Sequence, residues 1–421
     1  MHGSNLVVQN RDGKQNGCVP MAATANNRSN KESTGGQPQH FDWIDALRGF
    51  AILAVMLVHS SQFVRNLPKP LELIANQGAR GVQLFFIVSA VTLMHSLKVR
   101  ESFDGFLIFN FYVRRFFRIV PMFWVAIVGY VLLEGTGPRY GTSQRMSPWD
   151  IGLTAVFLHT WSPNAINSVV PGGWSITAEA MFYVCLPFLF RRIKSLAEGG
   201  LLVLASFFLG RLLTKLVFWF LSPWFAGEEQ YVLELFRFLW FPNQCYIFAL
   251  GILTYFVLKQ VPSVEGGRSS RFSGLSPAMK KSAIVLHLIW LFGTFVLCFS
   301  SGGYRYLPEH FLFGLVFVIL VWAFGVYPAP VLANRFTRHF GKISYSAYFI
   351  HFVVLDEMNR LVLPWYRSLT AIPVVQLVLV YGSCVIANLC LATLTHELIE
   401  KPGINWGKRF VRVRSLNVGS A

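Results

Sequence analysis

The stretch FDWIDALRGFAILAVMLVHSSQF, residues 41–63, decides the fold class because it is long and apolar enough to cross a lipid bilayer. A spanning helix needs about 20 mostly apolar residues. Within its expected spanning part, residues 44–64, lie three ionisable side chains, namely Asp45, Arg48 and His59. Each ionisable group inside a span costs on the order of 2.5–3.5 kcal/mol, so such groups are retained mainly for function. The stretch therefore predicts a first transmembrane helix with a candidate active centre inside it.

The spacing of these side chains defines one face of that helix. Asp45 and Arg48 are three residues apart and can form an ion pair. His59 follows Arg48 by eleven residues, which is about 16 Å along the axis and close to a whole number of turns. The alternative is an ion pair at the cytoplasmic mouth and a histidine satisfied at the outer interface.

Composition places the whole chain in the membrane class. Of its 421 residues, 54% are hydrophobic and only 14% are charged, and the mean hydropathy is +0.48. Soluble domains have about 25% charged residues. The formal net charge of +17 comes from basic residues clustered between apolar runs, which indicates the positive-inside rule and not a nucleic-acid partner.

Nine further apolar stretches follow the first. With the N-terminus in the cytoplasm, every second loop is rich in Lys and Arg, as cytoplasmic loops are. The sequence therefore predicts an all-α polytopic protein with about ten transmembrane helices and both termini cytoplasmic. The expected membrane is the plasma (inner) membrane. The expected spans are 44–64, 80–97, 114–134, 174–191, 200–221, 235–258, 283–299, 310–326, 343–363 and 373–396.

One apolar segment, residues 150–162, is too short to be counted among the spans. Counting it as a full span would place the basic stretch 191–194 outside the cytoplasm and would move every later loop to the opposite side of the membrane. We therefore expect residues 135–173 to form an extracytoplasmic excursion with a re-entrant or interfacial helix.

The chain divides into one membrane domain and two tails. Residues 1–40 are polar, lack an apolar signal-peptide core and are expected to be a disordered cytoplasmic tail. The transmembrane domain is expected over 41–408, and a basic cytoplasmic tail over 409–421. None of the six cysteines has the spacing of a zinc site, so no metal is expected.

Two further segments place charges inside expected spans. The segment FYVRRFFRIVPMFW carries Arg114, Arg115 and Arg118 at the cytoplasmic start of a helix, where guanidinium groups suit phosphate binding. The segment GGWSITAEAMFYVCLP carries Glu179 about one and a half turns into the fourth span. The alternatives are a basic anchor for the arginines and a packing ion pair for Glu179. Glu400, just before Lys401 and Pro402, can end the last helix, since a residue before proline resists helical geometry.

Together these motifs resemble the acyltransferase-3 family, the integral membrane O-acyltransferases of surface polysaccharides and related acceptors. The resemblance runs from about residue 41 to 408, and Ala90 departs mildly from it, since glycine is frequent there. The motifs are the acidic residue, arginine and histidine at 45, 48 and 59, the stretch GVQLFFIVSAV at 81–91, the arginine pair at 115 and 118, the residues Trp174, Ser175, Glu179, Phe182 and Tyr183, the stretch ISYSAYFIH at 343–351, and the terminal Glu400-Lys401-Pro402.

The resemblance implies transfer of an acyl group, most often acetyl, from cytoplasmic acyl-CoA to a hydroxyl of a glycan, a lipid-linked sugar or another acceptor. His59 is then the expected general base or acyl carrier, supported by Arg48, Glu179 and Asp45, with Glu179 able to orient the imidazole. The donor phosphates are expected to bind the basic side chains Arg114, Arg115, Arg118 and Arg48.

Two other functions fit part of the pattern. His351 and Asp356 have the histidine–four residues–aspartate spacing of glycerolipid acyltransferases, although further blocks of that class are not found. Buried Arg, His and Glu would also fit a proton-coupled transporter or flippase. That class does not explain the cytoplasmic arginine pair or the order of the motifs.

Overall fold

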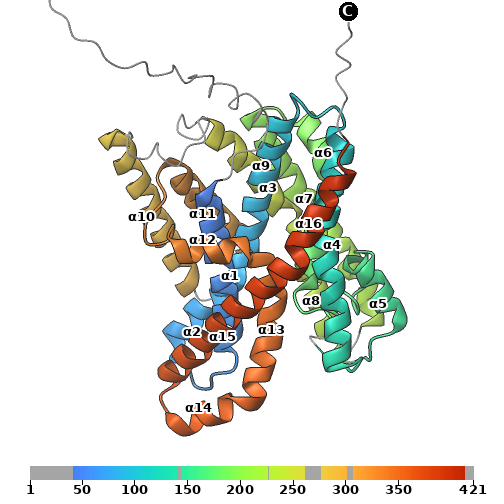
Figure 1. The fold of residues 1–421 in the computed structure, drawn as a ribbon, viewed down its shortest axis with the longest axis vertical. Helices are drawn as coiled ribbons and strands as arrows, with labels where there is room; N and C mark the ends of the chain where they lie inside the picture. Colours follow the sequence, from blue (N-terminus) through green and yellow to red (C-terminus); the bar gives the residue numbers. More distant parts are fainter. Residues whose placement is uncertain (1–40, 140–143, 226, 261–275, 301–306, 413–421) are drawn as a thin grey trace, which may run out of the picture. The chain divides into compact units, whose positions relative to one another are not determined.

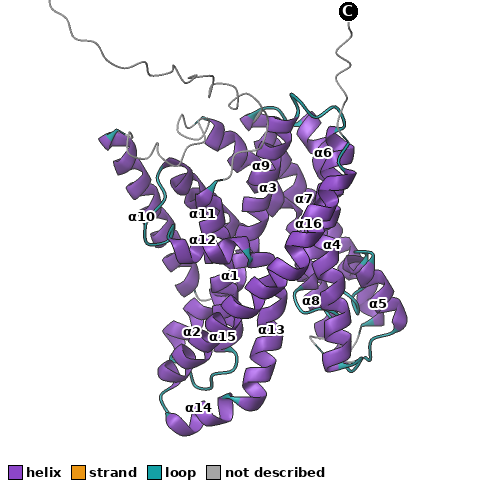
Figure 2. Cartoon of the chain, in the orientation of Figure 1, coloured by secondary structure: helices purple, strands orange, loops and turns teal. Residues whose placement is uncertain are grey.

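The computed structural model describes residues 41–139, 144–225, 227–260, 276–300 and 307–412 (Figure 1). The expected tail 1–40 and residues 413–421 of the expected C-terminal tail lie outside this part of the chain. Within it the regular secondary structure is entirely helical, as Figure 2 shows. The all-α architecture expected from the sequence is confirmed. In chain order the α-helices are α1 (Asp42–Ser61), α2 (Lys69–Asn76), α3 (Gly81–Arg100), α4 (Leu107–Glu134), α5 (Pro148–Ala155), α6 (Gly173–Arg192), α7 (Leu196–Leu221), α8 (Gln230–Leu239), α9 (Phe241–Lys259), α10 (Pro277–Phe299), α11 (Glu309–Val326), α12 (Arg335–Lys342), α13 (Ser344–Leu361), α14 (Leu363–Leu369), α15 (Pro373–Thr395) and α16 (Lys401–Gly407).

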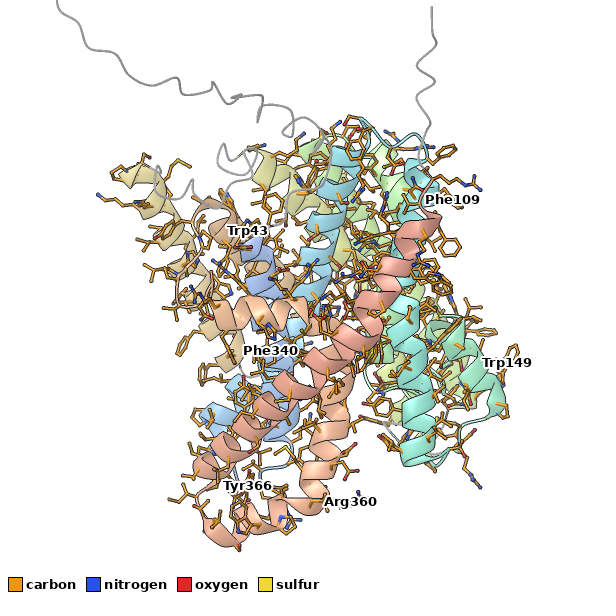
Figure 3. All side chains as sticks on the ribbon, in the orientation of Figure 1. Trp43, Phe109, Trp149, Phe340, Arg360 and Tyr366 are labelled. Carbon is orange, nitrogen blue, oxygen red and sulfur yellow. The ribbon has the colours of Figure 1, made fainter. Side chains whose placement is uncertain are left out.

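Nine helical segments of the described residues are long and apolar enough to cross a membrane. They match nine of the ten expected spans, and the multi-pass architecture is thereby confirmed. The remaining expected span, 343–363, corresponds to α13, a helix of 18 residues. It falls outside the nine because Asp356, Glu357 and Arg360 gather in its last turns, where Figure 3 labels Arg360.

Between α4 and α6 the described residues, 135–139 and 144–172, contain no spanning helix. The α-helix among them, α5, has eight residues and is therefore about 12 Å long, far short of the roughly 30 Å apolar layer. Ser147 and Asp150 close its first turn with a reciprocal capping box. The prediction that this segment is not a full span is confirmed.

Helix α1 lies at the centre of the helical packing and is crossed by α12 (Figure 1). Two glycines allow the crossing. A β-carbon on Gly49 would lie 1.8 Å from the carbonyl oxygen of Thr337, and one on Gly341 would lie 1.8 Å from that of Asp45. Backbone therefore rests directly on backbone here, and α12 fixes the segment of α1 that carries Asp45 and Arg48.

Helix α3 is joined to α6 and α9 by rings and by small residues. Phe248 stacks on Phe86 at 4.3 Å and on Phe182 at 4.4 Å between ring centroids. The methyl group of Ala90, the position where glycine is frequent in the family, faces Gly251 of α9. The mild sequence departure is thus accommodated by a glycine on the neighbouring helix.

The last helix does not end at Glu400, so that expectation was wrong. Glu400 has helical backbone angles, φ −66° and ψ −52°, and α15 continues through a π-helical turn, His396–Glu400, into α16. Pro402 is the second residue of α16 and directly follows this π turn. Isolated π turns are frequent at functional sites.

Candidate active site

Three cavities follow one another along α1 and share lining residues. The central cavity, of about 90 Å³, is lined by Arg48, Arg115, Arg118 and Glu179. The inner cavity, of about 300 Å³, lies at the N-terminal end of α1 and shares Arg48, Thr92 and Arg118 with it. The outer cavity, of about 440 Å³, lies at the C-terminal end of α1, contains His59, and shares Val82 and Tyr348 with the central cavity.

Arg48 is held between α1 and α3. Its Nη1 lies 3.6 Å from Oδ1 of Asp45, and its Nη2 donates a hydrogen bond of 3.3 Å to Oγ1 of Thr92. Arg48 is the residue that lines both the inner and the central cavity from α1. The expected pair of Asp45 and Arg48 is therefore present.

The arginines of α4 point in two directions. Arg115 and Arg118 both line the central cavity, and the guanidinium of Arg115 lies 5.9 Å from the ring centroid of Tyr183. Arg114 does not line it and instead pairs with Asp104 at 2.8 Å. Burial alone would raise the pKa of Asp104, but hydrogen bonds from Arg114 and Asn110 hold that pKa below its ordinary value. The structure thus separates Arg114 from the other two expected donor-binding arginines.

Arg118 lines two of the cavities and also lies close to the buried carboxylate of Glu400. Its Nη2 lies 3.9 Å from Oε1 of Glu400, whose side chain is fully buried. The other oxygen, Oε2, lies 3.0 Å from Nδ1 of His396 and accepts a 3.1 Å hydrogen bond from Ser346. The π turn brings His396 and Glu400 to this side of the helix, and His396 lines the inner cavity.

Glu179 lies among the arginines and not beside His59. One of its carboxylate oxygens accepts a hydrogen bond from the hydroxyl of Ser89 on α3. The expectation that Glu179 orients the imidazole is not met by this arrangement, because the two residues line different cavities. Both lie in expected spans, but the depth of a residue does not determine its position within the membrane plane.

His59 lines the outer cavity, and its hydrogen-bond partner there is Gln62 and not Glu179. Its Nδ1 lies 3.4 Å from Oε1 of Gln62, and its ring packs against Phe352 at 4.5 Å and His351 at 5.3 Å between centroids. An amide oxygen only accepts, so Nδ1 carries the hydrogen and Nε2 the free lone pair. An imidazole in this form can accept a proton.

Several lining residues were not found from the sequence. Lys342, at the end of α12, lines the inner cavity. Tyr345 and Tyr348 of α13 line the central cavity, where Tyr345 donates a 2.8 Å hydrogen bond to the carbonyl oxygen of Ile119. The two tyrosines lie three residues apart in ISYSAYFIH, and this spacing was the available signal.

Comparison with known proteins identifies the family. A family model described as "Acyltransferase domain" matches residues 41–396. The chain belongs to the acyltransferase-3 family. It is 25% identical over 401 residues to "Nodulation protein 10" of Rhizobium leguminosarum bv. viciae, covering 89% of this chain and 95% of the relative. It is 28% identical over 163 residues to "Acyltransferase MdmB" of Streptomyces mycarofaciens, covering 36% of this chain and 40% of the relative. No solved structure matches.

Membership of the acyltransferase-3 family makes the chain an integral multi-pass acyltransferase, which uses an acyl donor. It favours this activity over the transporter or flippase. The geometry also weakens the glycerolipid acyltransferase alternative. His351 and Asp356 lie five residues apart on one α-helix, which turns their side chains about 140° apart.

Proposed function

We propose that this acyltransferase moves an acetyl group from cytoplasmic acetyl-CoA to a hydroxyl of a glycan, a lipid-linked sugar or a related acceptor at the opposite face. The observation that carries the proposal is the series of three cavities, with guanidinium groups at one end and His59 at the other. About 16 Å of helix separates Arg48 from His59, a distance suited to an extended pantetheine arm.

The donor phosphates bind at the inner end in this proposal. Arg118 and Arg48 line both the inner and central cavities, and Lys342 adds an ammonium group at the inner cavity. Arg115 lies deeper, beside Tyr183 and Glu179, and contacts the part of the donor that enters the central cavity. Guanidinium forks match phosphate oxygens well, and a lysine acts as a point charge.

The acceptor binds in the outer cavity, whose size is within the range of small-molecule sites. Trp174, Phe238 and Phe352 offer aromatic walls, and Gln62 and Gln83 offer amides. His59 takes the proton of the acceptor hydroxyl on Nε2, and the oxygen attacks the thioester carbonyl. The carbon–sulfur bond then breaks, and the proton returns from His59 to the thiolate that leaves.

Acetyl-CoA consumption by the purified protein tests the proposal. We expect H59A and R48A to abolish acetyl transfer while the protein still accumulates in the membrane. R115A should raise the KM for acetyl-CoA more than it lowers kcat. Full activity of H59A would remove this residue from the mechanism.

Mass spectrometry of surface glycans from a strain lacking the protein tests the acceptor class. Loss of one acetyl group from a single sugar would identify both donor and acceptor. An unchanged glycan profile, with acetyl-CoA still consumed by the purified protein, would direct the search to a non-glycan hydroxyl.

A further inference from the structure

His351 is a fully buried histidine that the proposed reaction does not use. It lies in the middle of α13, and its Nδ1 is 3.2 Å from the carbonyl oxygen of Ala347. A carbonyl only accepts, so Nδ1 donates and Nε2 carries the lone pair. That Nε2 is buried and has no hydrogen-bond partner among the described residues. An unsatisfied buried acceptor costs about 1–3 kcal/mol, so its retention needs an explanation.

The surroundings of His351 direct attention to His59. Three rings enclose its imidazole, with centroids at 4.1 Å for Phe352, 5.3 Å for His59 and 5.8 Å for Tyr348. Of these, His59 is the ring that gains a positive charge when it takes a proton from the acceptor. The 5.3 Å between the two centroids leaves hydrogen-bond distance between a nitrogen of each ring when the two nitrogens point toward each other.

A second histidine shows that the missing partner alone is not diagnostic. His287 of α10 also has its Nδ1 on the carbonyl oxygen four residues earlier, Ala283, at 2.7 Å, and its Nε2 is likewise buried without a partner in the described chain. Its neighbouring ring is Phe324, at 5.5 Å. His351 therefore differs from His287 by facing a second imidazole that lines a cavity.

We propose that His351 is a positioning residue, whose Nε2 accepts a hydrogen bond from the imidazolium form of His59. The inference rests on the proposed function, in which His59 holds the acceptor proton while the acceptor oxygen attacks the thioester. A lone pair facing that charge stabilises it in an apolar setting, because hydrogen bonds to charged groups are the strong ones. The unsatisfied acceptor of the resting state then becomes satisfied as the reaction proceeds.

Two variants of His351 separate this role from packing. H351N keeps a donor for the carbonyl of Ala347 and removes the acceptor, whereas H351Q keeps an acceptor near the position of Nε2. We expect H351N to lower kcat about tenfold or more and to move the acid limb of the kcat–pH profile down by about one pH unit or more. H351Q should keep the acid limb at its wild-type position.

The other charged groups at the outer cavity stay constant in these variants. They are Arg80, which pairs with Glu309 at 3.1 Å, and Asp356. H287N is the matched control, and both its rate and its acid limb should equal those of the wild type. H351F replaces H351N if the latter does not accumulate in the membrane.

Four outcomes decide the inference. An acid limb of H351N or H351F that coincides with the wild type overturns it, and so does an equal shift in H351N and H351Q. A fully active H59A instead overturns the role of His59 in the proposed function. An inactive H59A with an unshifted H351N leaves the proposed function intact and removes His351 alone.

Discussion

At the residue scale, the buried carboxylate of Glu400 connects the last helix to the arginine pair. It contacts Arg118, His396 and Ser346 from within a π turn. E400Q keeps the hydrogen bond from Ser346 and removes the negative charge near Arg118. We expect the free energy of unfolding to fall by about 1–3 kcal/mol, since a cation loses its buried counter-charge. Thermal unfolding in detergent measures the change.

The same turn offers a matched control for E400Q. Glu397 is exposed and pairs with Lys401 at 2.6 Å, three residues before Glu400 on the same helix. E397Q removes the same charge at the surface and should leave the unfolding temperature unchanged. Equal losses in the two variants would mean that the buried network does not stabilise the protein.

The buried side chain of His159 should make the free energy of unfolding depend on pH. It lies between α5 and α6, where its ring contacts the hydroxyl of Thr177, and burial lowers its pKa from 6.5 to about 4. The unfolded chain then binds more protons than the folded one between pH 6.5 and 4. The contribution of His159 to the free energy of unfolding is therefore fully present above pH 6.5. It falls by about 1.4 kcal/mol per pH unit as the pH drops towards 4. Unfolding temperatures at pH 7 and 5 should differ less in H159Q than in the wild type.

The sequence predicted the charged residues of the central cavity better than their partners. Buried charges are costly in an apolar span, so Arg48 and Glu179 are conspicuous in the sequence. Around the helix, Arg118 lies about 60° from Arg115 and about 40° from Arg114, so spacing on one helix did not show that Arg114 pairs elsewhere, with Asp104. Contacts between helices, such as that of Glu179 with Ser89, depend on packing that the sequence does not display.

At the element scale, the crossing of α12 over α1 depends on two glycines that have no room for a side chain. G341A would press a methyl group onto the carbonyl oxygen of Asp45, 1.8 Å away, and neither backbone can yield without moving its helix. We expect G341A to destabilise the protein by about 1–3 kcal/mol or more and to displace Asp45 and Arg48. Thermal unfolding and acetyl-CoA consumption both report the effect.

Other helical glycines of the same chain provide the control. A β-carbon on Gly129 of α4 or Gly382 of α15 would meet no atom within 4 Å. G129A and G382A should be neutral or slightly stabilising, because alanine favours helix by about 1 kcal/mol over glycine. A loss in these variants as large as in G341A would argue against the crossing as the cause.

The helices themselves were largely predictable, and their exceptions have physical causes. Nine expected spans reappear because about 20 apolar residues suffice to define each one. The continuation of α15 through Glu400 was not expected, because helices usually end at or before the residue that precedes a proline. Here a π-helical turn precedes Pro402, and the helix continues. Helix α12 was also not expected, since it is a short, basic helix whose place is set by contact with α1.

At the scale of the whole molecule, the three cavities form a route only if the constriction between them stays open. Val82 and Tyr348 line both the central and the outer cavity, and Val82 is 6% exposed. The central cavity, of about 90 Å³, is the smallest of the three and has little room for added atoms.

A larger side chain at Val82 tests whether the acyl group passes this constriction. V82F adds a ring where the two cavities meet, far from the inner cavity and its basic side chains. We expect acetyl transfer to fall about tenfold or more, since the reacting groups no longer meet, while acetyl-CoA binding changes little. V128F, on a side chain of α4 that is 58% exposed, makes the same change outside the route and should retain activity. Unimpaired transfer by V82F would show that donor and acceptor meet without crossing from the central to the outer cavity.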